Sequence, residues 1–187
     1  RDFGVKTITV YALSTENLKR SEKEVNYIMN LAVEFLEKEL ANAIKNDLKI
    51  NVIGDIYNER VDEKTRNCFL NAMQKTKDCK TYVLNIAFVY GGRDEIVRAV
   101  NKIIESGLKN ITESDFEKFL YTAGQPDPDL IVRASGEQRV SNFLMWQHAY
   151  SEFYFLDTLW PDFDKETVKK CIIEYQKRTR KFGKVEE

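Results

Sequence analysis

The chain has 187 residues, of which 43% are hydrophobic and 32% are charged, and its formal net charge is −1. This length suits one well-cored domain, and a charge near zero argues against broad nucleic-acid binding. Three cysteines without Cys-x-x-Cys spacing argue against a disulfide framework or a zinc site and favour a reducing compartment. No apolar stretch is long enough to span a bilayer and no secretory signal is visible, so we expect a cytoplasmic protein.

The first third of the chain predicts two strands separated by a long helix. Residues 5–13 are rich in Val, Ile, Thr and Tyr and predict a buried strand. Ser21 and Glu24 have the spacing of a capping box, which opens a helix over 21–45 with apolar residues at intervals of three and four. Residues 48–53 predict a second strand.

The middle of the chain continues this alternation. A charged amphipathic helix is predicted over 58–77, a third strand over 81–90 and another helix from 94 to about 105. Thr112 is a candidate N-cap for a short helix that runs through three apolar residues, Phe116, Phe119 and Leu120.

The last third predicts two short strands and two helices. Residues 130–133 predict a short parallel strand, which a turn and a helix follow, and residues 153–155 predict a last strand. Asp164 caps a C-terminal helix predicted to reach about residue 182. Strands that alternate with helices predict a single α/β domain over 1–187, with a mainly parallel central sheet flanked by helices.

Polar residues follow three of the predicted strands. They are Ser14, Thr15, Glu16 and Asn17 after the first strand, Gly91, Gly92 and Arg93 after the third, and Ser135, Gly136 and Glu137 after the fourth. Functional residues of parallel sheets gather at the carboxyl ends of strands, so the three groups predict one polar rim. Each group alone also fits ordinary turn chemistry, and Arg133 could instead pair with Asp127 or Asp129.

The region after residue 130 has the chemistry of an oxyanion site. Arg133 and Arg139 offer permanently charged donor forks that match phosphate geometry, and Ser141 adds a hydroxyl. A carboxylate such as Glu152 is wasteful for plain anion binding but can hold Mg²⁺ against phosphate oxygens. The sequence therefore predicts a diphosphate site with a metal.

Three blocks of sequence also carry a family resemblance. The C-terminal block is Arg133-x-Ser-Gly-Glu-x-Arg-x-Ser-Asn-Phe, followed by Trp146-Gln-x-Ala-Tyr-Ser-Glu-Phe-Tyr-Phe and Leu159-Trp-Pro-Asp-Phe. The other two are Tyr11-Ala-Leu-Ser-Thr-Glu-Asn-Leu-Lys-Arg and Leu84-Asn-Ile-Ala-Phe-Val-Tyr-Gly-Gly-Arg-Asp-Glu-Ile. In this order and spacing the blocks resemble the cis-prenyltransferases, and most of all the bacterial undecaprenyl diphosphate synthases.

Members of that family condense isopentenyl diphosphate with an allylic diphosphate, usually farnesyl diphosphate, and use Mg²⁺. The product is a long-chain cis-polyprenyl diphosphate, in the bacterial enzymes undecaprenyl diphosphate for the cell-wall lipid carrier. The resemblance implies that isopentenyl diphosphate binds at Arg133, Arg139, Val140 and Ser141. It places the allylic substrate at Ser14, Thr15, Glu16, Leu18 and Arg20.

The resemblance gives roles to the remaining positions as well. Asn17 matches a position that takes part in proton removal, and because an amide is a poor base, we expect it to orient groups or to relay through water or phosphate. Glu152 would help to bind Mg²⁺ in its own or in a partner subunit. Supporting positions would be Gly91, Gly92, Arg93 and Gly136.

The chain departs from the family pattern at several positions. The N-terminal Asp-Gly-Asn-Gly-Arg motif, which carries the principal carboxylate, is absent, so by resemblance the domain lacks its N-terminal strand and helix. We expect the 187-residue chain, without that motif, to fold but to be nearly inactive. Leu18 replaces a Trp, Val89 an Asn, and Lys181 an Arg.

Partners follow from composition and resemblance together. Aromatic residues between 143 and 155 exceed what one short helix and strand bury, which predicts a homodimer through this block. The 21–45 helix is read most simply as core, and by resemblance it also walls a hydrophobic tunnel for the growing chain. The basic run over 177–184 predicts a solvated face or a contact with anionic lipid at the inner face of the plasma membrane.

Two other functions remain open at this point. One is a non-catalytic accessory subunit of a cis-prenyltransferase heterodimer, and the other is a generic phosphate-binding module without a long apolar cavity. His148 is the only histidine, which excludes a site with several histidines, and it is predicted to pack.

Overall fold

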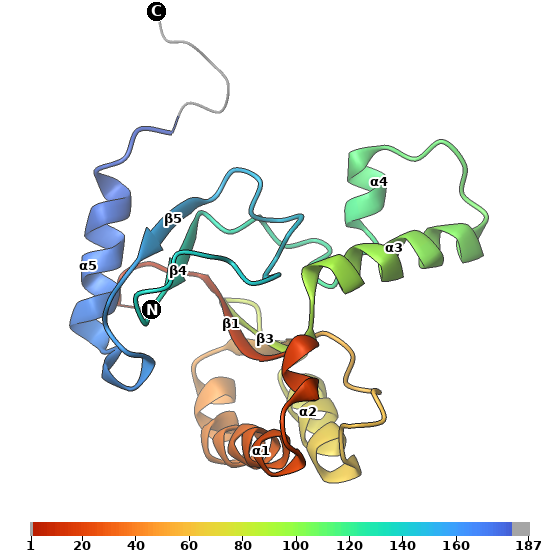
Figure 1. The fold of residues 1–187 in the computed structure, drawn as a ribbon, viewed down its shortest axis with the longest axis horizontal. Coiled ribbons are helices and arrows are strands. Elements are labelled where there is room, and N and C mark those ends of the chain that lie inside the picture. The colour runs from red at the N-terminus through yellow and green to blue at the C-terminus, as the bar shows by residue number, and fades with distance from the viewer. Residues whose placement is uncertain (1, 181–187) are drawn as a thin grey trace, which may run out of the picture. The chain divides into compact units, whose positions relative to one another are not determined.

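The computed structural model describes residues 2–180. The chain divides into two units, Arg1–Gly124 and Gln125–Glu187. In the first unit, the strands β1 (Thr7–Ser14), β2 (Leu48–Ile53) and β3 (Tyr82–Tyr90) form a parallel sheet in the order β1-β3-β2 (Figure 1). All three lie within one residue or two of the predicted strands, and the parallel α/β fold is confirmed.

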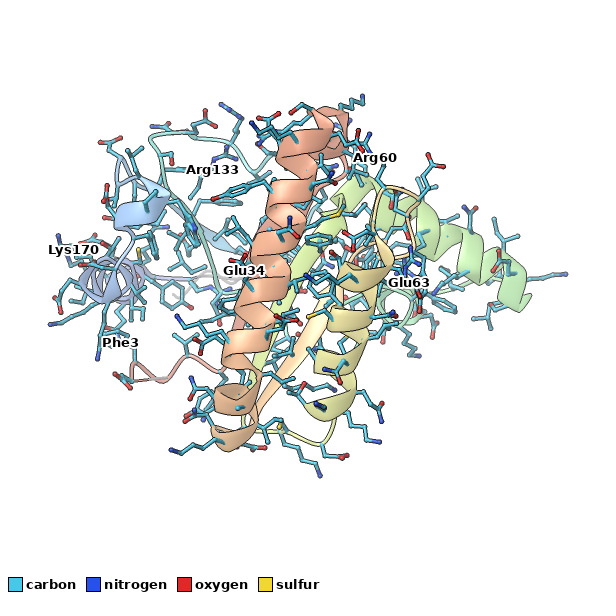
Figure 2. All side chains as sticks on the ribbon, turned by 90° about the horizontal axis from the view of Figure 1, so that it is seen from below. Phe3, Glu34, Arg60, Glu63, Arg133 and Lys170 are labelled. Carbon is cyan, nitrogen blue, oxygen red and sulfur yellow. The ribbon has the colours of Figure 1, made fainter. Side chains whose placement is uncertain are left out.

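Two helices cover one face of this sheet. Figure 2 shows α1 (Glu22–Lys45) and α2 (Glu63–Lys75) side by side across the strands, with Glu34 and Glu63 labelled on them. Both halves of the predicted capping box are present, because the Ser21 side chain accepts from Glu24 and the Glu24 side chain accepts from the Ser21 backbone. The apolar faces of the helices and strands form one core, which includes Val25, Met29, Leu36, Ile50, Phe69, Ile86 and Phe88.

The carboxyl end of β3 is kinked at Val89. Its φ is +49°, and its carbonyl accepts from the Asp55 backbone at 3.1 Å. Gly54 passes so close to the Phe88 carbonyl that a Cβ would not fit there. A β-branched residue is an outlier in this left-handed region, whereas Asn is enriched in it. The Asn that the resemblance places at this position would therefore suit the observed backbone better than Val89 does.

Beyond the kink, α3 (Gly92–Ser106) leads away from the three strands, and α4 (Glu113–Glu117) lies beside it (Figure 1). One side of α3 is buried, but the other exposes an apolar stripe that continues past the end of the helix. The stripe comprises Val97, Val100, Ile104, Leu108 and Ile111, which are 37–69% exposed.

The second unit contains a two-stranded parallel sheet. It is formed by β4 (Leu130–Arg133) and β5 (Glu152–Phe155), and a 3-10 turn at Trp160–Asp162 precedes α5 (Lys165–Gln176). The parallel strands of the chain thus form two sheets, of three and two strands, among residues 2–180. No helix in that range is long and apolar enough to cross a membrane.

Several predicted helices have different bounds in the structure. The second helix begins at Glu63 instead of 58, because Asp62 caps it by accepting from the Thr65 backbone. The short fourth helix ends at Glu117, before Phe119 and Leu120. The last helix ends at Gln176, short of the predicted 182, which lies outside the described residues.

The helix predicted between the strands over 130–133 and 153–155 is wrong, since residues 134–151 contain turns, bends and irregular structure. Ser141, Asn142 and Leu144 have φ values of +49°, +64° and +48°, which no right-handed helix allows. His148 lies in these turns and packs edge-on against Phe153, with ring centroids 5.5 Å apart, as predicted for a packing residue.

Candidate active site

The first group of predicted site residues forms a closed loop after β1. The Ser14 backbone donates to Asn17 Oδ1 at 3.0 Å, and the Asn17 backbone donates to Ser14 Oγ at 3.1 Å. This reciprocal pair fixes the Asn17 side chain at the start of a 3-10 turn, Glu16–Lys19. Because the Asn17 oxygen is engaged, its NH₂ is the group left to act on a ligand. The residue therefore offers a donor and not a base.

The loop is attached to the end of β3 through one carbonyl. Tyr90 O accepts from the Thr15 backbone at 3.0 Å and from the Tyr11 hydroxyl at 3.0 Å. Burial, together with the negative charge of Glu16, raises the pKa of Tyr11 to about 12. The Tyr11 hydroxyl therefore stays protonated at neutral pH and remains a donor to Tyr90. Ser14 and Tyr90 are also register partners of β1 and β3, so two of the three predicted polar groups share one sheet edge.

The other residues of this edge differ in exposure. Gly91 caps α3 and Gly92 begins it, and both are buried, whereas Arg93 is exposed. Leu18 packs against the core, and Arg20 is exposed. Thr15 donates its hydroxyl to Glu16 at 3.1 Å. The positions predicted for the allylic substrate thus include one apolar side chain packed against the core, Leu18, and two exposed charged ones, Glu16 and Arg20.

The second group, after β4, is built from charged side chains. Arg133 Nη1 donates to Ser141 Oγ at 2.8 Å and to the Arg139 carbonyl at 2.7 Å. Arg133 Nη2 donates to Glu137 Oε2 at 2.5 Å, and Arg139 also pairs with that oxygen. These contacts bring Arg133, Arg139 and Ser141 together, and their role in binding isopentenyl diphosphate stays a prediction. Neither Asp127 nor Asp129 appears among the hydrogen bonds and ion pairs of Arg133 within residues 2–180, and Asp129 pairs with Arg180.

Glu137 belongs to the predicted polar rim but was not among the residues predicted to bind a substrate. The hydrogen bond from Arg139 is the largest of the effects that hold the pKa of the Glu137 carboxyl below its usual range; desolvation opposes it, and the Arg133 hydrogen bond and the charges of both arginines add to the lowering. Its carboxylate thus lies between the guanidiniums of Arg133 and Arg139. The signal was present in the sequence, as a lone carboxylate four residues after one Arg and two before the next.

Left-handed turns hold this cluster in place. Ser135 and Gly136 have φ of +73° and +71°, and their backbone N–H groups donate to Thr158 and Leu156 carbonyls at 2.8 and 2.7 Å. The φ of Gly136 favours glycine, and a Cβ there would in addition lie 3.3 Å from the Asp157 carboxylate. Val140 accepts from the Phe143 backbone at 3.1 Å and thereby begins the turn that carries Ser141.

Glu152 lies at the other end of the two-stranded sheet. In the register of β4 and β5, Leu130 faces Glu152 and Arg133 faces Phe155. Three residues along a strand span about 10 Å, so Glu152 is distant from the Arg133 cluster of its own chain. Glu152 Oε2 accepts from Arg178 Nη1 at 2.7 Å instead.

The donor set for Mg²⁺ is correspondingly small. Residues 2–180 contain no cluster of three or more His, Cys, Asp or Glu side chains that could hold a metal ion. Mg²⁺ sites commonly use only one or two carboxylates and complete the shell with substrate phosphates and water. Glu152 fits that role as a single carboxylate ligand, provided that a diphosphate comes close to it.

A parallel α/β fold whose strands end in amide, hydroxyl and guanidinium donors is the architecture expected of a cis-prenyltransferase. A sequence profile described as putative undecaprenyl diphosphate synthase matches residues 1–183. The isoprenyl transferase of Clostridium perfringens is 49% identical in an alignment of 186 residues, which covers 96% of this chain and 73% of that protein. The chain belongs to this undecaprenyl diphosphate synthase family of prenyltransferases.

Further relatives agree on the family. The ditrans,polycis-undecaprenyl-diphosphate synthase of Micrococcus luteus is 46% identical and aligns with 97% of this chain and 75% of its own length. The crystal structure of lavandulyl diphosphate synthase from Lavandula x intermedia, in complex with dimethylallyl diphosphate, superposes with a TM-score of 0.91. It is 34% identical and covers 97% of this chain and 80% of that one.

A probable undecaprenyl diphosphate synthase from Campylobacter jejuni gives a TM-score of 0.86 at 37% identity, over 96% of this chain and 84% of that one. These findings favour a transferase over an accessory subunit and over a generic phosphate-binding module.

Proposed function

We propose that the protein condenses isopentenyl diphosphate with an allylic, farnesyl-type diphosphate to give a long-chain cis-polyprenyl diphosphate, undecaprenyl diphosphate in particular. The observation that carries this proposal is the cluster of Arg133, Arg139 and Ser141 around a carboxylate. In each step the allylic C1–O bond breaks, diphosphate leaves, and C1 bonds to C4 of the isopentenyl unit. The C2 proton of that unit is lost, and the new double bond is cis.

In this proposal Arg133, Arg139 and Ser141 bind the diphosphate of the isopentenyl unit. Arg133 already presents one Nη to a hydroxyl and the other to a carboxylate, which are the contacts that a phosphate oxygen would take over. Ser141 accepts from Arg133 and so keeps its own proton available for an anion. The substrate must displace Glu137, and this makes binding an exchange of one anion for another.

Asn17 is proposed to orient the allylic diphosphate or the proton acceptor by means of its NH₂ group. Both its backbone and its side-chain oxygen are fixed by Ser14, so the donor direction is set before a substrate binds. Mg²⁺, when bound, would stabilise negative charge on the leaving diphosphate. Glu152 is its proposed protein ligand among the described residues.

We also propose that the protein is a homodimer and that Glu152 serves the site of the partner subunit. In support, Glu152 is about 10 Å along the strands from the Arg133 cluster of its own chain. The apolar stripe on α3, at Val97, Val100 and Ile104, offers a surface that a second copy could bury. In the aromatic block predicted as the interface, Tyr150 is 69% exposed, whereas the other aromatic side chains are partly buried.

The long hydrocarbon product also bears on location. Within residues 22–45, α1 buries one apolar stripe and exposes a second, made of Tyr27, Leu31 and Phe35 at 45–64% exposure. We propose that this helix walls the tunnel for the growing chain. Release of so apolar a product calls for peripheral contact with a bilayer, at the cytoplasmic face where the lipid carrier is used.

The activity is tested with the protein expressed from its complete gene. Labelled isopentenyl diphosphate and farnesyl diphosphate are supplied with Mg²⁺, and incorporation into butanol-soluble polyprenyl product is measured. We expect activity with Mg²⁺ and none in excess EDTA, with recovery when Mg²⁺ is restored. No incorporation under any of these conditions, together with tight binding of both diphosphates, would favour the phosphate-binding module.

Subunit mixing tests the shared site. Arg133→Ala and Glu152→Ala proteins are each made, then mixed under mild dissociating conditions and dialysed. If Glu152 acts across the interface, a mixed dimer has one intact site and regains roughly half of the wild-type activity. If Glu152 acts within its own chain, both sites of the mixed dimer are damaged and activity does not return. Ile104→Glu should yield monomers by sedimentation if α3 forms the interface.

A further inference from the structure

A carboxyl group with no role in the proposed chemistry is buried at the base of α3. Glu95 is 1% exposed and lies in the first turn of that helix. Its Oε2 accepts from the Tyr90 hydroxyl at 2.5 Å, and its Oε1 accepts from the Tyr121 backbone at 2.7 Å. Both carboxyl oxygens therefore hold donors that come from outside the helix.

Tyr90 connects this carboxyl to the loop of Asn17. The Tyr90 side chain is fully buried, and its hydroxyl is held by Glu95. Its main-chain carbonyl holds the Thr15 backbone and the Tyr11 hydroxyl, each at 3.0 Å. One residue thus receives support from Glu95 through its side chain and gives support to the loop through its backbone.

The backbone next to Tyr90 is strained and requires stabilising contacts. Val89, directly before it, is in the left-handed region, which is strained for a β-branched residue. Strained backbone persists only where the surroundings over-determine it. Glu95 provides this constraint on the helix side, and the Asp55 backbone, which donates to the Val89 carbonyl, provides it on the side of Gly54.

Tyr121 secures the opposite side of the carboxyl. The Arg98 guanidinium lies over the Tyr121 ring at 3.7 Å and donates to the Phe119 carbonyl at 2.7 Å. The segment after α4 is thereby fixed to α3, and its Tyr121 N–H is held at the Glu95 oxygen. The carboxyl therefore joins the segment after α4 to Tyr90, at the end of β3.

We propose that Glu95 is a positioning residue for the reaction, which acts through Tyr90 to set the place of the Asn17 amide. The proposal rests on the role proposed above for Asn17. The series of contacts runs from Glu95 to the Tyr90 hydroxyl. It continues from the Tyr90 carbonyl to the Thr15 N–H, which belongs to the Ser14–Asn17 loop. Glu95 touches no substrate in this scheme, so its loss should change the rate of chemistry and not the affinity for either diphosphate.

Two substitutions weaken this series of contacts at different points. Glu95→Gln removes the charge of the side chain, and an NH₂ group turned toward Tyr90 reverses the direction of that hydrogen bond and ends its charge assistance. Tyr90→Phe removes only the hydroxyl and keeps the ring and the carbonyl. In the full protein we expect each to lower kcat about tenfold, with the KM of both substrates within about twofold of wild type. Glu63→Gln, at an exposed position of α2 with no role in the proposed site, is the matched control and should change neither value.

Hydrogen exchange gives a readout that does not depend on activity. The Thr15 N–H, protected by Tyr90 O in the wild type, should exchange faster in both variants, while amides of the α1–α2 core do not. Faster exchange throughout the first unit would mean general destabilisation and would overturn the proposal. So would unchanged protection at Thr15.

The Asn17→Ala background separates the two proposals. If Glu95 acts through Asn17, then Glu95→Gln should lower kcat no further in Asn17→Ala protein. A full additional tenfold loss would overturn the positioning role and leave the role of Asn17 intact. If Asn17→Ala is itself fully active, the proposed function of Asn17 fails, and the exchange result at Thr15 still reports whether Glu95 controls the loop.

Discussion

The two groups of site residues are held in place by opposite means. After β1, the loop of Ser14 and Asn17 is fixed by backbone hydrogen bonds and by the carbonyl of a fully buried tyrosine. After β4, Arg133, Glu137 and Arg139 are partly exposed side chains that hold one another by charge. The first group is ordered by the fold, whereas the second is ordered by an internal anion that a substrate can replace.

This difference suits the two tasks proposed for them. A group that directs a reacting atom must be in place before the substrate arrives, because reorganisation during the reaction raises the barrier. A group that binds and releases a diphosphate many times during chain elongation benefits from a resident anion of moderate strength. Without one, two adjacent guanidiniums would repel each other whenever the site is empty.

The largest effect that tests this contrast comes from removing the guanidiniums. Arg133→Ala should weaken the binding of isopentenyl diphosphate by ~1.5–3 kcal/mol, because charge-assisted donors to that substrate are lost. The affinity for the allylic substrate should stay nearly unchanged. Arg139→Ala should cost less, since its side chain is 62% exposed against 28% for Arg133. Separate titrations of the two diphosphates measure this, with Arg60→Ala, an exposed arginine on a loop, as control. Equal losses for both substrates would contradict the assignment.

The next effect concerns strain stored beside the buried loop. Val89 and Val33 are both buried, at 1% and 2% exposure, but only Val89 has a left-handed backbone. Val33→Asn should therefore lower the free energy of unfolding by the full cost of burying an amide. Val89→Asn should cost about 1–3 kcal/mol less, because Asn tolerates that backbone. Denaturant unfolding of both variants gives the comparison, and equal losses of stability would show that the kink at Val89 is not strained.

The same contrast explains which features of the structure could be predicted from the sequence. Local patterns predict the capping box of Ser21 and Glu24 and the five strands. The C-terminal sequence block places Arg133 and Ser141 in one site. Turns at Ser141, Asn142 and Leu144 could not be predicted, since nothing in these residue types demands positive φ. The link from Glu95 through Tyr90 to Thr15 joins positions 80 residues apart, and only the register of β1 and β3 brings them together.

The placement of Glu152 was beyond sequence reasoning for a similar reason. Its position 19 residues after Arg133 suggested proximity to the oxyanion site. The parallel register of β4 and β5 instead puts the two residues at opposite ends of the sheet. A one-dimensional distance could not reveal this, because in a parallel pair the alignment of the strands, and not the length of the connection, decides which residues are neighbours.

The smallest expected effect is the most specific test of the exchangeable anion. Glu137→Gln keeps the size of the side chain but removes the charge that competes with a diphosphate for Arg133 and Arg139. We expect several-fold tighter binding of isopentenyl diphosphate in the absence of turnover, and slower product release, which lowers kcat. The pKa of Glu137 is below the usual range for a carboxyl, so the wild-type residue stays ionised at neutral pH.

The difference between the Glu137→Gln variant and wild type should therefore be constant between about pH 6 and pH 8. The difference should also shrink as salt is added, because exposed charges are screened. Asp115→Asn, which removes a carboxylate paired with Lys118 on the other unit, is the control and should leave diphosphate binding unchanged. Weaker binding in Glu137→Gln would mean that the carboxylate orients the guanidiniums for the substrate. In that case the second site, like the first, is ordered in advance.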